Sequence, residues 1–296
     1  MNNVTQLHQP NSISLSSSSM LVELSVSQWT GRKLDRHAGE EVARANNAKS
    51  GAASVTKKLI VCDELKAIGS LVSTVRATHY HMTLPWLDTG IRLLPTAQYF
   101  DYQKTMTDYQ QQFDKLVEAF VQQYSWEVSR AQLTLGALFN ADEYPSIESI
   151  RRKFSLRLSY IPMPDAGDFR IDVGNDAQQQ LATQYQNMFD AKIGEAMNDL
   201  WSRLYDALRH MSNKLVDKDG KRQKLYESML DNVMSLINLL DTCNITNDPD
   251  MARAKRELRD ALEGVTTEQL KDSDLARRRT KSEIDSIIAS LPSISL

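Results

Sequence analysis

The sequence contains few of the residue types that build disulfide-bonded, loop-rich or membrane-spanning proteins. Its 296 residues include only two cysteines, 11 glycines and 8 prolines. Cys62 and Cys243 do not form a Cys-x-x-Cys pair, so we expect two reduced thiols rather than a redox motif. No apolar run approaches the ~20 residues that a membrane-spanning helix needs. The N-terminus lacks the basic start and apolar core of a signal peptide, which predicts an intracellular protein.

A strong charge of either sign is also absent. The 35 basic residues nearly balance the 38 acidic residues, and the formal net charge is −3. Dedicated nucleic-acid-binding domains are usually basic, so the overall charge does not indicate one. It does not exclude a local basic face.

Familiar catalytic motifs are missing as well. The sequence has no phosphate-binding loop with a Walker lysine, no Gly-x-Gly-x-x-Gly element, no Gly-x-Ser-x-Gly elbow and no His-Glu-x-x-His pair. These absences predict a protein that is not an enzyme and uses no cofactor.

What the sequence does contain is two unusually long heptad patterns. Apolar and aromatic residues recur at steps of three and four over about 97–140 and again over about 176–216. Such stripes lie on one face of a helix and must be buried against another element. We therefore predict a mainly α (α+β) fold: a long antiparallel helical hairpin of the coiled-coil type with a small antiparallel β-sheet at one end.

The sheet is predicted from alternating apolar residues. Residues 20–26, 154–160 and 169–173 each show the period of two that is typical of half-buried strands. The last two segments are expected to form a β-hairpin, and the first is expected to join it because a lone hairpin is marginal in water. The apolar segment 83–96 is predicted to be a loop that packs against another element.

Local signals define the remaining helices and the division of the chain. Helix starts are predicted at Asp248, which precedes Pro249, and at Thr266, which is followed by Gln269 at the capping-box spacing. A helix end is predicted at Gly264. Further helices are expected over about 223–240 and 274–290. We predict a disordered tail over 1–19, the helical hairpin with its sheet over 20–220, and C-terminal helices that pack on this bundle over 221–296.

Two histidines form one candidate site. His79 and His81 flank Tyr80 directly before the turn at 83–85. Histidines two residues apart can bind a metal from a strand or loop, but no third ligand stands in a recognisable spacing. A structural or interface role is therefore the stronger interpretation, with a metal site as the alternative.

Short basic clusters form the other candidate site. If they converge on one face, they could bind phosphates with steep salt dependence. The alternative is an ordinary solvated surface. The predicted phosphate contacts are Arg151, Arg152, Lys153, Arg157, Arg170, Arg277, Arg278 and Arg279.

Several segments together resemble a family of uncharacterised proteins from tailed bacteriophages and prophages. They are WTGRKLD at 29–35, ANNA at 45–48, KKLI at 57–60, TLPW at 83–86 with Asp88, Gly90, Arg92, Leu94 and Pro95, FSL at 154–156, PMPDAGDFR at 162–170, and DLW at 199–201 with Leu204 and Tyr205. The resemblance covers roughly residues 20–290. It implies a phage origin and the cytoplasm of the bacterial host. Such genes often lie among replication and recombination genes or beside MoxR-type AAA+ ATPases, and the family supplies no catalytic residues.

Two functions follow as hypotheses. The first is a helical interaction or assembly protein that associates with itself or with other phage proteins. The alternative is a DNA-binding accessory factor in phage replication or recombination. Neither requires a membrane, and no small-molecule substrate is evident.

Overall fold

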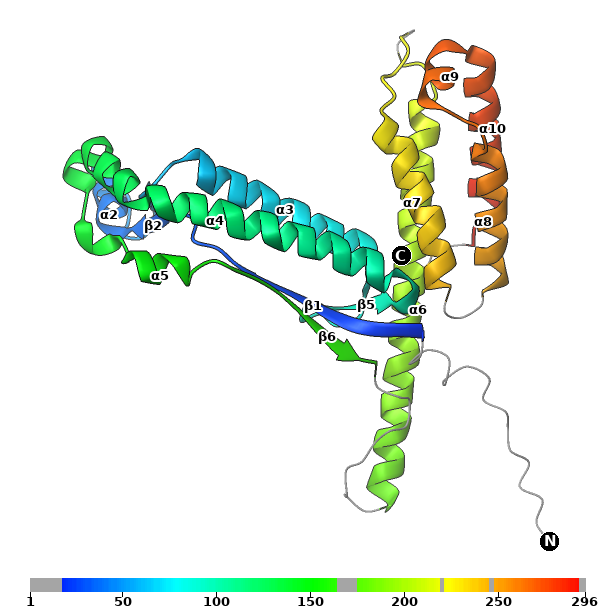
Figure 1. Ribbon diagram of the computed structural model, residues 1–296, viewed down its shortest axis with the longest axis horizontal. Helices are drawn as coiled ribbons and strands as arrows, with labels where there is room; N and C mark the ends of the chain where they lie inside the picture. The colour runs from blue at the N-terminus through cyan, green and yellow to red at the C-terminus, as the bar shows by residue number, and fades with distance from the viewer. Residues whose placement is uncertain (1–17, 164–174, 219–220, 245–247, 293–296) are drawn as a thin grey trace. The chain divides into compact units, whose positions relative to one another are not determined.

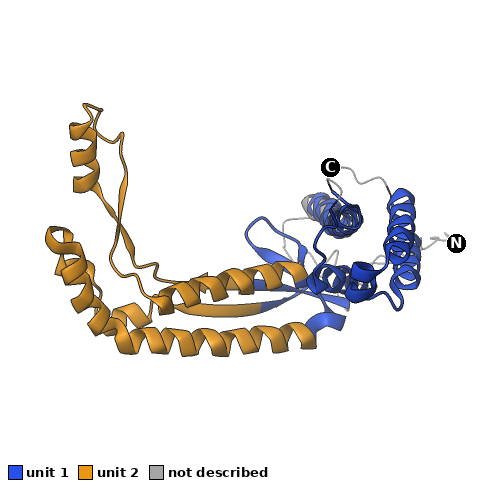
Figure 2. Ribbon diagram, turned by 90° about the horizontal axis from the view of Figure 1, so that it is seen from above, with its two compact units in different colours: residues 1–23, 82–99, 160–296 blue, residues 24–81, 100–159 orange. Residues whose placement is uncertain are grey.

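The computed structural model describes residues 18–163, 175–218, 221–244 and 248–292. The chain divides into two units (Figure 2). Unit 1 comprises residues 1–23, 82–99 and 160–296, and unit 2 comprises residues 24–81 and 100–159. Helices predominate in both units and a small antiparallel sheet accompanies them, as the mainly α (α+β) prediction expects.

The four-stranded sheet has the order β4-β5-β1-β6. Its strands are β1 (Ser19–Ser27), β4 (Leu84–Pro85), β5 (Ile91–Pro95) and β6 (Ser155–Pro162). β1 pairs antiparallel with β5, with Leu21 opposite Leu93. The predicted strand at 20–26 therefore exists and lies beside the strand predicted at 154–160. The other predicted hairpin strand, 169–173, falls outside the described residues.

The structure corrects the prediction for the segment 83–96. Instead of a loop it forms the β4–β5 hairpin, whose turn contains Gly90 at φ 97°. The amide of Leu87 donates to the carbonyl of Ile91 at 3.0 Å, which closes the turn. Leu84 and Leu93 are fully buried, and this burial explains why the segment is so apolar. A two-residue strand shows too little periodicity to be recognised in the sequence.

Unit 2 is built on two helices that lie side by side (Figure 1), α3 (Asp63–Met82) and α4 (Tyr99–Leu135). The hydroxyls of Thr78 and Tyr109 lie 3.2 Å apart across this pair. Both helices bury apolar stripes, among them Ile68, Val72, Val75, Met106, Phe113 and Phe120. The same unit contains α2 (Arg36–Ala45), α5 (Ile147–Arg151) and a two-stranded sheet of β2 (Arg32–Asp35) and β3 (Val55–Lys58).

Unit 1 is a helical bundle. It contains α6 (Asn175–Lys214), α7 (Glu227–Cys243), α8 (Pro249–Leu262), the short α9 (Thr267–Asp272) and α10 (Asp274–Ser290). α6 packs against α7 and α10, and α8 packs against both of these helices, so the four long helices enclose a common core. Leu204, Leu208, Val233, Leu258 and Ile284 are fully buried in it.

The predicted long hairpin of the two heptad segments is not shown. Both segments are helices over nearly the predicted lengths, but α6 belongs to unit 1 and all of α4 beyond Tyr99 belongs to unit 2. Each stripe is buried within its own unit, by α3 in one case and by α7 and α10 in the other. The heptads therefore predicted helix and burial but not the partner.

Local end signals are confirmed in unit 1. Asp248 caps α8 by accepting from the amide of Asp250 at 2.8 Å, and Thr266 caps α9 by accepting from Gln269 at 3.2 Å. Gly264 follows α8 with φ 71°, and α10 covers the predicted residues 274–290. None of the helices in the described ranges combines the length and apolarity needed to span a bilayer.

Candidate functional site

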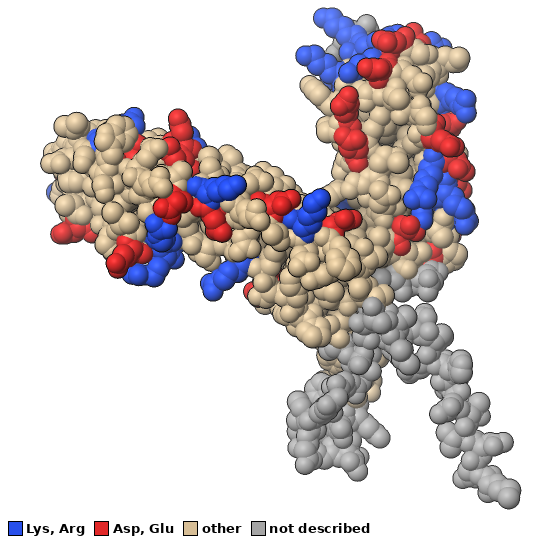
Figure 3. Space-filling view, viewed as in Figure 1, with Lys and Arg blue, Asp and Glu red and all other residues tan. Residues whose placement is uncertain are grey.

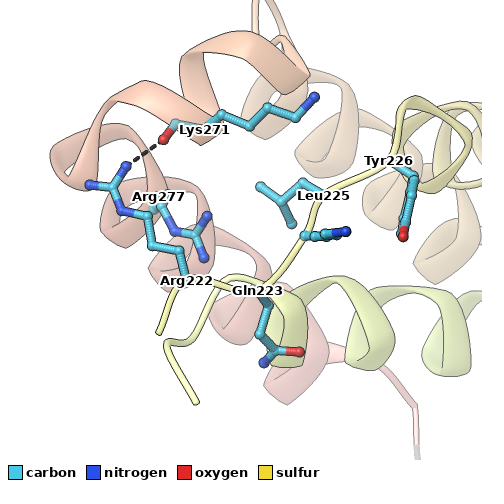
Figure 4. Close-up of a pocket in the computed structure, with 7 residues that line it drawn as sticks. Arg222, Gln223, Leu225, Tyr226, Lys271 and Arg277 are labelled. Carbon is cyan, nitrogen blue, oxygen red and sulfur yellow. Dashed lines mark hydrogen bonds between the residues drawn. The ribbon is translucent and has the colours of Figure 1, made fainter. Parts of the chain in front are cut away.

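A basic pocket lies in unit 1 where α6 and α9 end. Its volume is about 370 Å³. The lining residues come from the segment before α7, from α9 and from the first turns of α10: Arg222, Gln223, Lys224, Leu225, Tyr226, Lys271 and Arg277 (Figure 4).

The segment before α7 is held to the end of α6 by its own side chains. The amide of Gln223 donates to the carbonyls of Asn213 at 2.8 Å and Val216 at 3.0 Å. Leu225 is buried and belongs to the core of the bundle. These contacts fix the backbone from which the other pocket residues extend.

Arg277 ties two helix ends together. Its guanidinium group donates to the carbonyls of Leu270 and Lys214, both at 3.2 Å, and lies 3.6 Å from a carboxylate oxygen of Asp217. The last carbonyls of a helix lack intrahelical partners and carry partial negative charge, so a cation is favourable there. Arg277 is 3% exposed, and its position is therefore fixed before any ligand arrives.

Arg222 is held on the same side of the pocket. It donates to the carbonyl of Lys271, the bond drawn in Figure 4, and to the carboxylate of Asp274. These contacts place the guanidinium groups of Arg222 and Arg277 on one side of the pocket, with Leu225 and Tyr226 on the other (Figure 4).

The remaining cations are not neutralised. Lys224 and Lys271 are exposed, and neither forms an ion pair with any described residue. Four cations thus line the pocket against the two carboxylates of Asp217 and Asp274. Figure 3 shows Lys and Arg side chains at this end of unit 1, where α9 lies in Figure 1, with Asp and Glu side chains beside them. A concave surface with excess positive charge attracts anions.

The three arginines predicted at 277–279 have three different roles. Arg277 is the buried pocket residue, Arg278 is exposed, and Arg279 forms an ion pair with Glu283 at 2.9 Å. Successive helical residues point about 100° apart. The run therefore does not act as one basic face.

The basic residues predicted near the sheet lie in unit 2, except Arg170, which is outside the described residues. Arg151 forms an ion pair with Glu118, and Arg152 donates to the hydroxyl of Ser149 at 3.3 Å. Lys153 and Arg157 are exposed. Arg157 lies on β6, on the wet side that the alternation predicts.

The two histidines lie in a helix rather than a strand or loop. His79 is buried, and its Nδ1 is 2.7 Å from the hydroxyl of Tyr102. Residues two apart on a helix do not share a face, so His79 and His81 do not point at a common position. Within the described ranges, no group of three or more histidine, cysteine or carboxylate side chains is placed to hold a metal.

Most residues of this pocket were not predicted from the sequence. Arg222, Lys224, Tyr226 and Lys271 were not predicted as site residues. The available signal was the group of basic residues Lys218, Lys221, Arg222 and Lys224, which follows the end of α6.

Comparison with known proteins adds no relative. No protein-family model matches the sequence, and neither a curated protein nor a solved structure matches it. The function is therefore inferred from the pocket itself.

Proposed function

We propose that the protein is a non-enzymatic nucleic-acid-binding factor whose phosphate contacts are the basic pocket of unit 1. The observation that supports this proposal is the excess of cations there, with Lys224 and Lys271 exposed beside two anchored arginines. Guanidinium groups suit phosphate because their donors form a planar fork, and lysines add mobile positive charge.

The setting follows from the resemblance to phage proteins. A factor encoded among replication and recombination genes meets single-stranded and double-stranded DNA in the host cytoplasm. We therefore propose an accessory role in which the protein holds DNA while other proteins carry out the chemistry.

A binding titration tests this function. Wild-type protein should bind fluorescent DNA at low salt, with an affinity that falls steeply between about 50 and 200 mM salt. The double variant Lys224→Glu with Lys271→Glu should weaken binding and reduce the slope of log K against log salt by about 1.5, since each phosphate contact contributes about 0.7 to 0.9.

Arg256→Glu is the matched control. Arg256 is an exposed cation of α8 in the same unit and does not line the pocket. Reversal of its charge should leave the slope of log K against log salt unchanged. Absence of wild-type binding to either DNA form at micromolar protein would refute the proposed function, and equal effects of both variants would refute the assignment to this pocket.

A specific feature of unit 2 favours self-association as a second candidate function. Trp126 and Leu133 of α4 are 62% and 87% exposed. Residues seven apart lie on one face of a helix, and large exposed apolar side chains that share a face are typical of interaction surfaces.

Light scattering during gel filtration tests this second function. Wild-type protein should have a mass above that of one chain, and the double variant Trp126→Ala with Leu133→Ala should shift it toward the monomer. Leu275→Ala, which removes a side chain 80% exposed in unit 1, is the control and should not change the mass. A monomeric wild type would eliminate this candidate.

A further inference from the structure

We infer that the basic pocket of unit 1 binds the phosphorylated end of a nucleic-acid strand, with the terminal phosphate among its cations and the adjoining base against Tyr226. This inference rests on the proposed nucleic-acid binding and assigns a substrate class to the same site. Four features of the pocket lead to it.

The first feature is that the pocket has two chemically different sides. Arg222 and Arg277 lie opposite Leu225 and Tyr226 (Figure 4). A terminal nucleotide has the same division, with a charged phosphate at one end and an aromatic base at the other. Tyr226 is 62% exposed, so a base can stack on its ring without any rearrangement of the core.

The second feature is the charge. A phosphate monoester carries about −1.5 to −2 at neutral pH, whereas each internal phosphate of a strand carries one negative charge. Asp217 and Asp274 offset two of the four cations that line the pocket. The two exposed lysines, Lys224 and Lys271, therefore match the charge of a monoester better than that of an internal diester.

The third feature is the size of the site. A volume of about 370 Å³ lies at the small end of the range for ligand pockets, about 300 to 1,000 Å³. Arg277 and Leu225, the two buried residues of the lining, are 3% and 4% exposed. A pocket this small accommodates one nucleotide, whereas an internal stretch of strand needs a longer groove.

Arg277 also retains hydrogen-bonding capacity. A guanidinium group has five N–H donors, and two carbonyls, those of Leu270 and Lys214, accept from Arg277. The donors that remain belong to a group already fixed in place. A phosphate bound there orders little additional structure, which favours binding.

The test compares single-stranded oligonucleotides of one sequence that carry a 5′-phosphate, a 3′-phosphate or only hydroxyl ends. We expect one phosphorylated form to bind about tenfold more tightly than the hydroxyl form, the change that one charge-assisted hydrogen bond produces. The form that gains identifies the end that is recognised. Equal affinities for all three would overturn the inference while leaving the proposed function intact, whereas no binding of any form would remove both.

Variants connect the preference to the pocket. Lys224→Gln with Lys271→Gln should abolish the preference for a phosphorylated end, and Arg256→Gln should preserve it. Tyr226→Ala should weaken binding of the preferred oligonucleotide several-fold, with partial rescue by Tyr226→Phe, since the ring supplies the stacking surface. Preservation of the preference in the double lysine variant would overturn the inference.

Two competitors exclude simpler ligands. Inorganic phosphate and a phosphoserine peptide should displace the preferred oligonucleotide only at much higher concentration than a nucleoside monophosphate does. If inorganic phosphate displaced the oligonucleotide as effectively as the nucleoside monophosphate does, the pocket would be a free-anion site. That result would overturn the role of the base. The same result with the peptide would indicate a protein partner and overturn the strand-end assignment.

Discussion

At the scale of single residues, Lys57 shows how unit 2 accommodates a buried charge. Its amine donates to the carbonyl of Leu138 at 2.8 Å and lies 2.7 Å from Glu143 and 3.4 Å from Asp35. Burial by itself lowers the pKa of Lys57, but the hydrogen bonds and charges of Glu143 and Asp35 outweigh it and raise the pKa above its ordinary value. The lysine is therefore fully charged at neutral pH and joins β3 to two other segments.

Replacing this lysine should be costly. Lys57→Met leaves the carboxylate of Glu143, whose side chain is 12% exposed, with Lys33 at 3.6 Å as its remaining ion-pair partner among the described residues. Loss of one partner of a buried pair costs about 3 to 5 kcal/mol, because the other charge stays desolvated. Urea unfolding should show a loss near 3 kcal/mol. The double variant Lys57→Met with Glu143→Leu should recover part of it, and no recovery would contradict this account.

Tyr124 provides a prediction at alkaline pH. Its hydroxyl donates to the carbonyl of Pro145 at 2.9 Å, and burial raises the pKa from 10.0 to about 12. A pKa raised by folding contributes stability that is complete below the unfolded value and is lost as pH rises through the folded value. The free energy of unfolding should therefore decline between about pH 10 and 12.

Tyr124→Phe separates this residue from the other tyrosines. The variant should lose about 1 kcal/mol at neutral pH with the hydrogen bond, and its alkaline decline should be shallower. Phenolate absorbance of the two folded proteins should show a tyrosine that titrates near pH 12 in the wild type and is missing in the variant. An unchanged alkaline decline in the variant would assign the effect to another group.

At the scale of elements, Gly31 sets the approach of two segments in unit 2. It has φ 65°, and its carbonyl accepts from the amides of Leu59 at 2.7 Å and Ile60 at 3.2 Å. A Cβ at this position would lie 2.8 Å from the carbonyl oxygen of Ile60. A side chain here is therefore opposed both by the backbone conformation and by the carbonyl of Ile60.

Gly136 allows these two costs to be separated. It has φ 51°, but a Cβ there would meet nothing within 4 Å. Gly136→Ala should lose only the conformational cost, about 1 kcal/mol, whereas Gly31→Ala should lose about 2 to 3 kcal/mol. Thermal and urea unfolding of both variants measure the difference. Equal losses would show that the contact with Ile60 relaxes without cost.

Elements were predictable from the sequence where their signals are local. The caps at Asp248 and Thr266 and the stop at Gly264 need only neighbouring residues, and all three are confirmed. The β4–β5 hairpin was missed because β4 is only two residues long and β5 is defined by its pairing with β1, which lies about 70 residues away along the chain. Pairing of this kind leaves no periodic pattern in so short a segment.

At the scale of the whole molecule, the sequence could not assign partners to the long helices. A heptad stripe shows that one face is buried, and many apolar surfaces can bury it. The pocket was missed for a related reason. Arg277 comes from α10, Lys271 from α9 and Arg222 from the segment before α7, and only the folding of the bundle brings them together.

The division into two units predicts how the molecule loses structure. Leu208 is fully buried in the core of unit 1, and Met106 is fully buried in unit 2. Replacement of either by alanine should cost about 2 to 5 kcal/mol, from lost burial and the cavity that remains. We expect each loss to fall first on the unit that contains the substitution, because regions with separate cores open with separate free energies.

Hydrogen exchange of the amides along the chain tests whether the two units open separately. Leu208→Ala should accelerate amide exchange in α6, α7, α8 and α10 while α3 and α4 keep their protection, and Met106→Ala should do the reverse. The pair controls for the size of the change, since both remove a large apolar side chain. If each variant accelerated exchange equally in both units, the chain would open as one cooperative body. Binding at the pocket of unit 1 would then also protect α3 and α4.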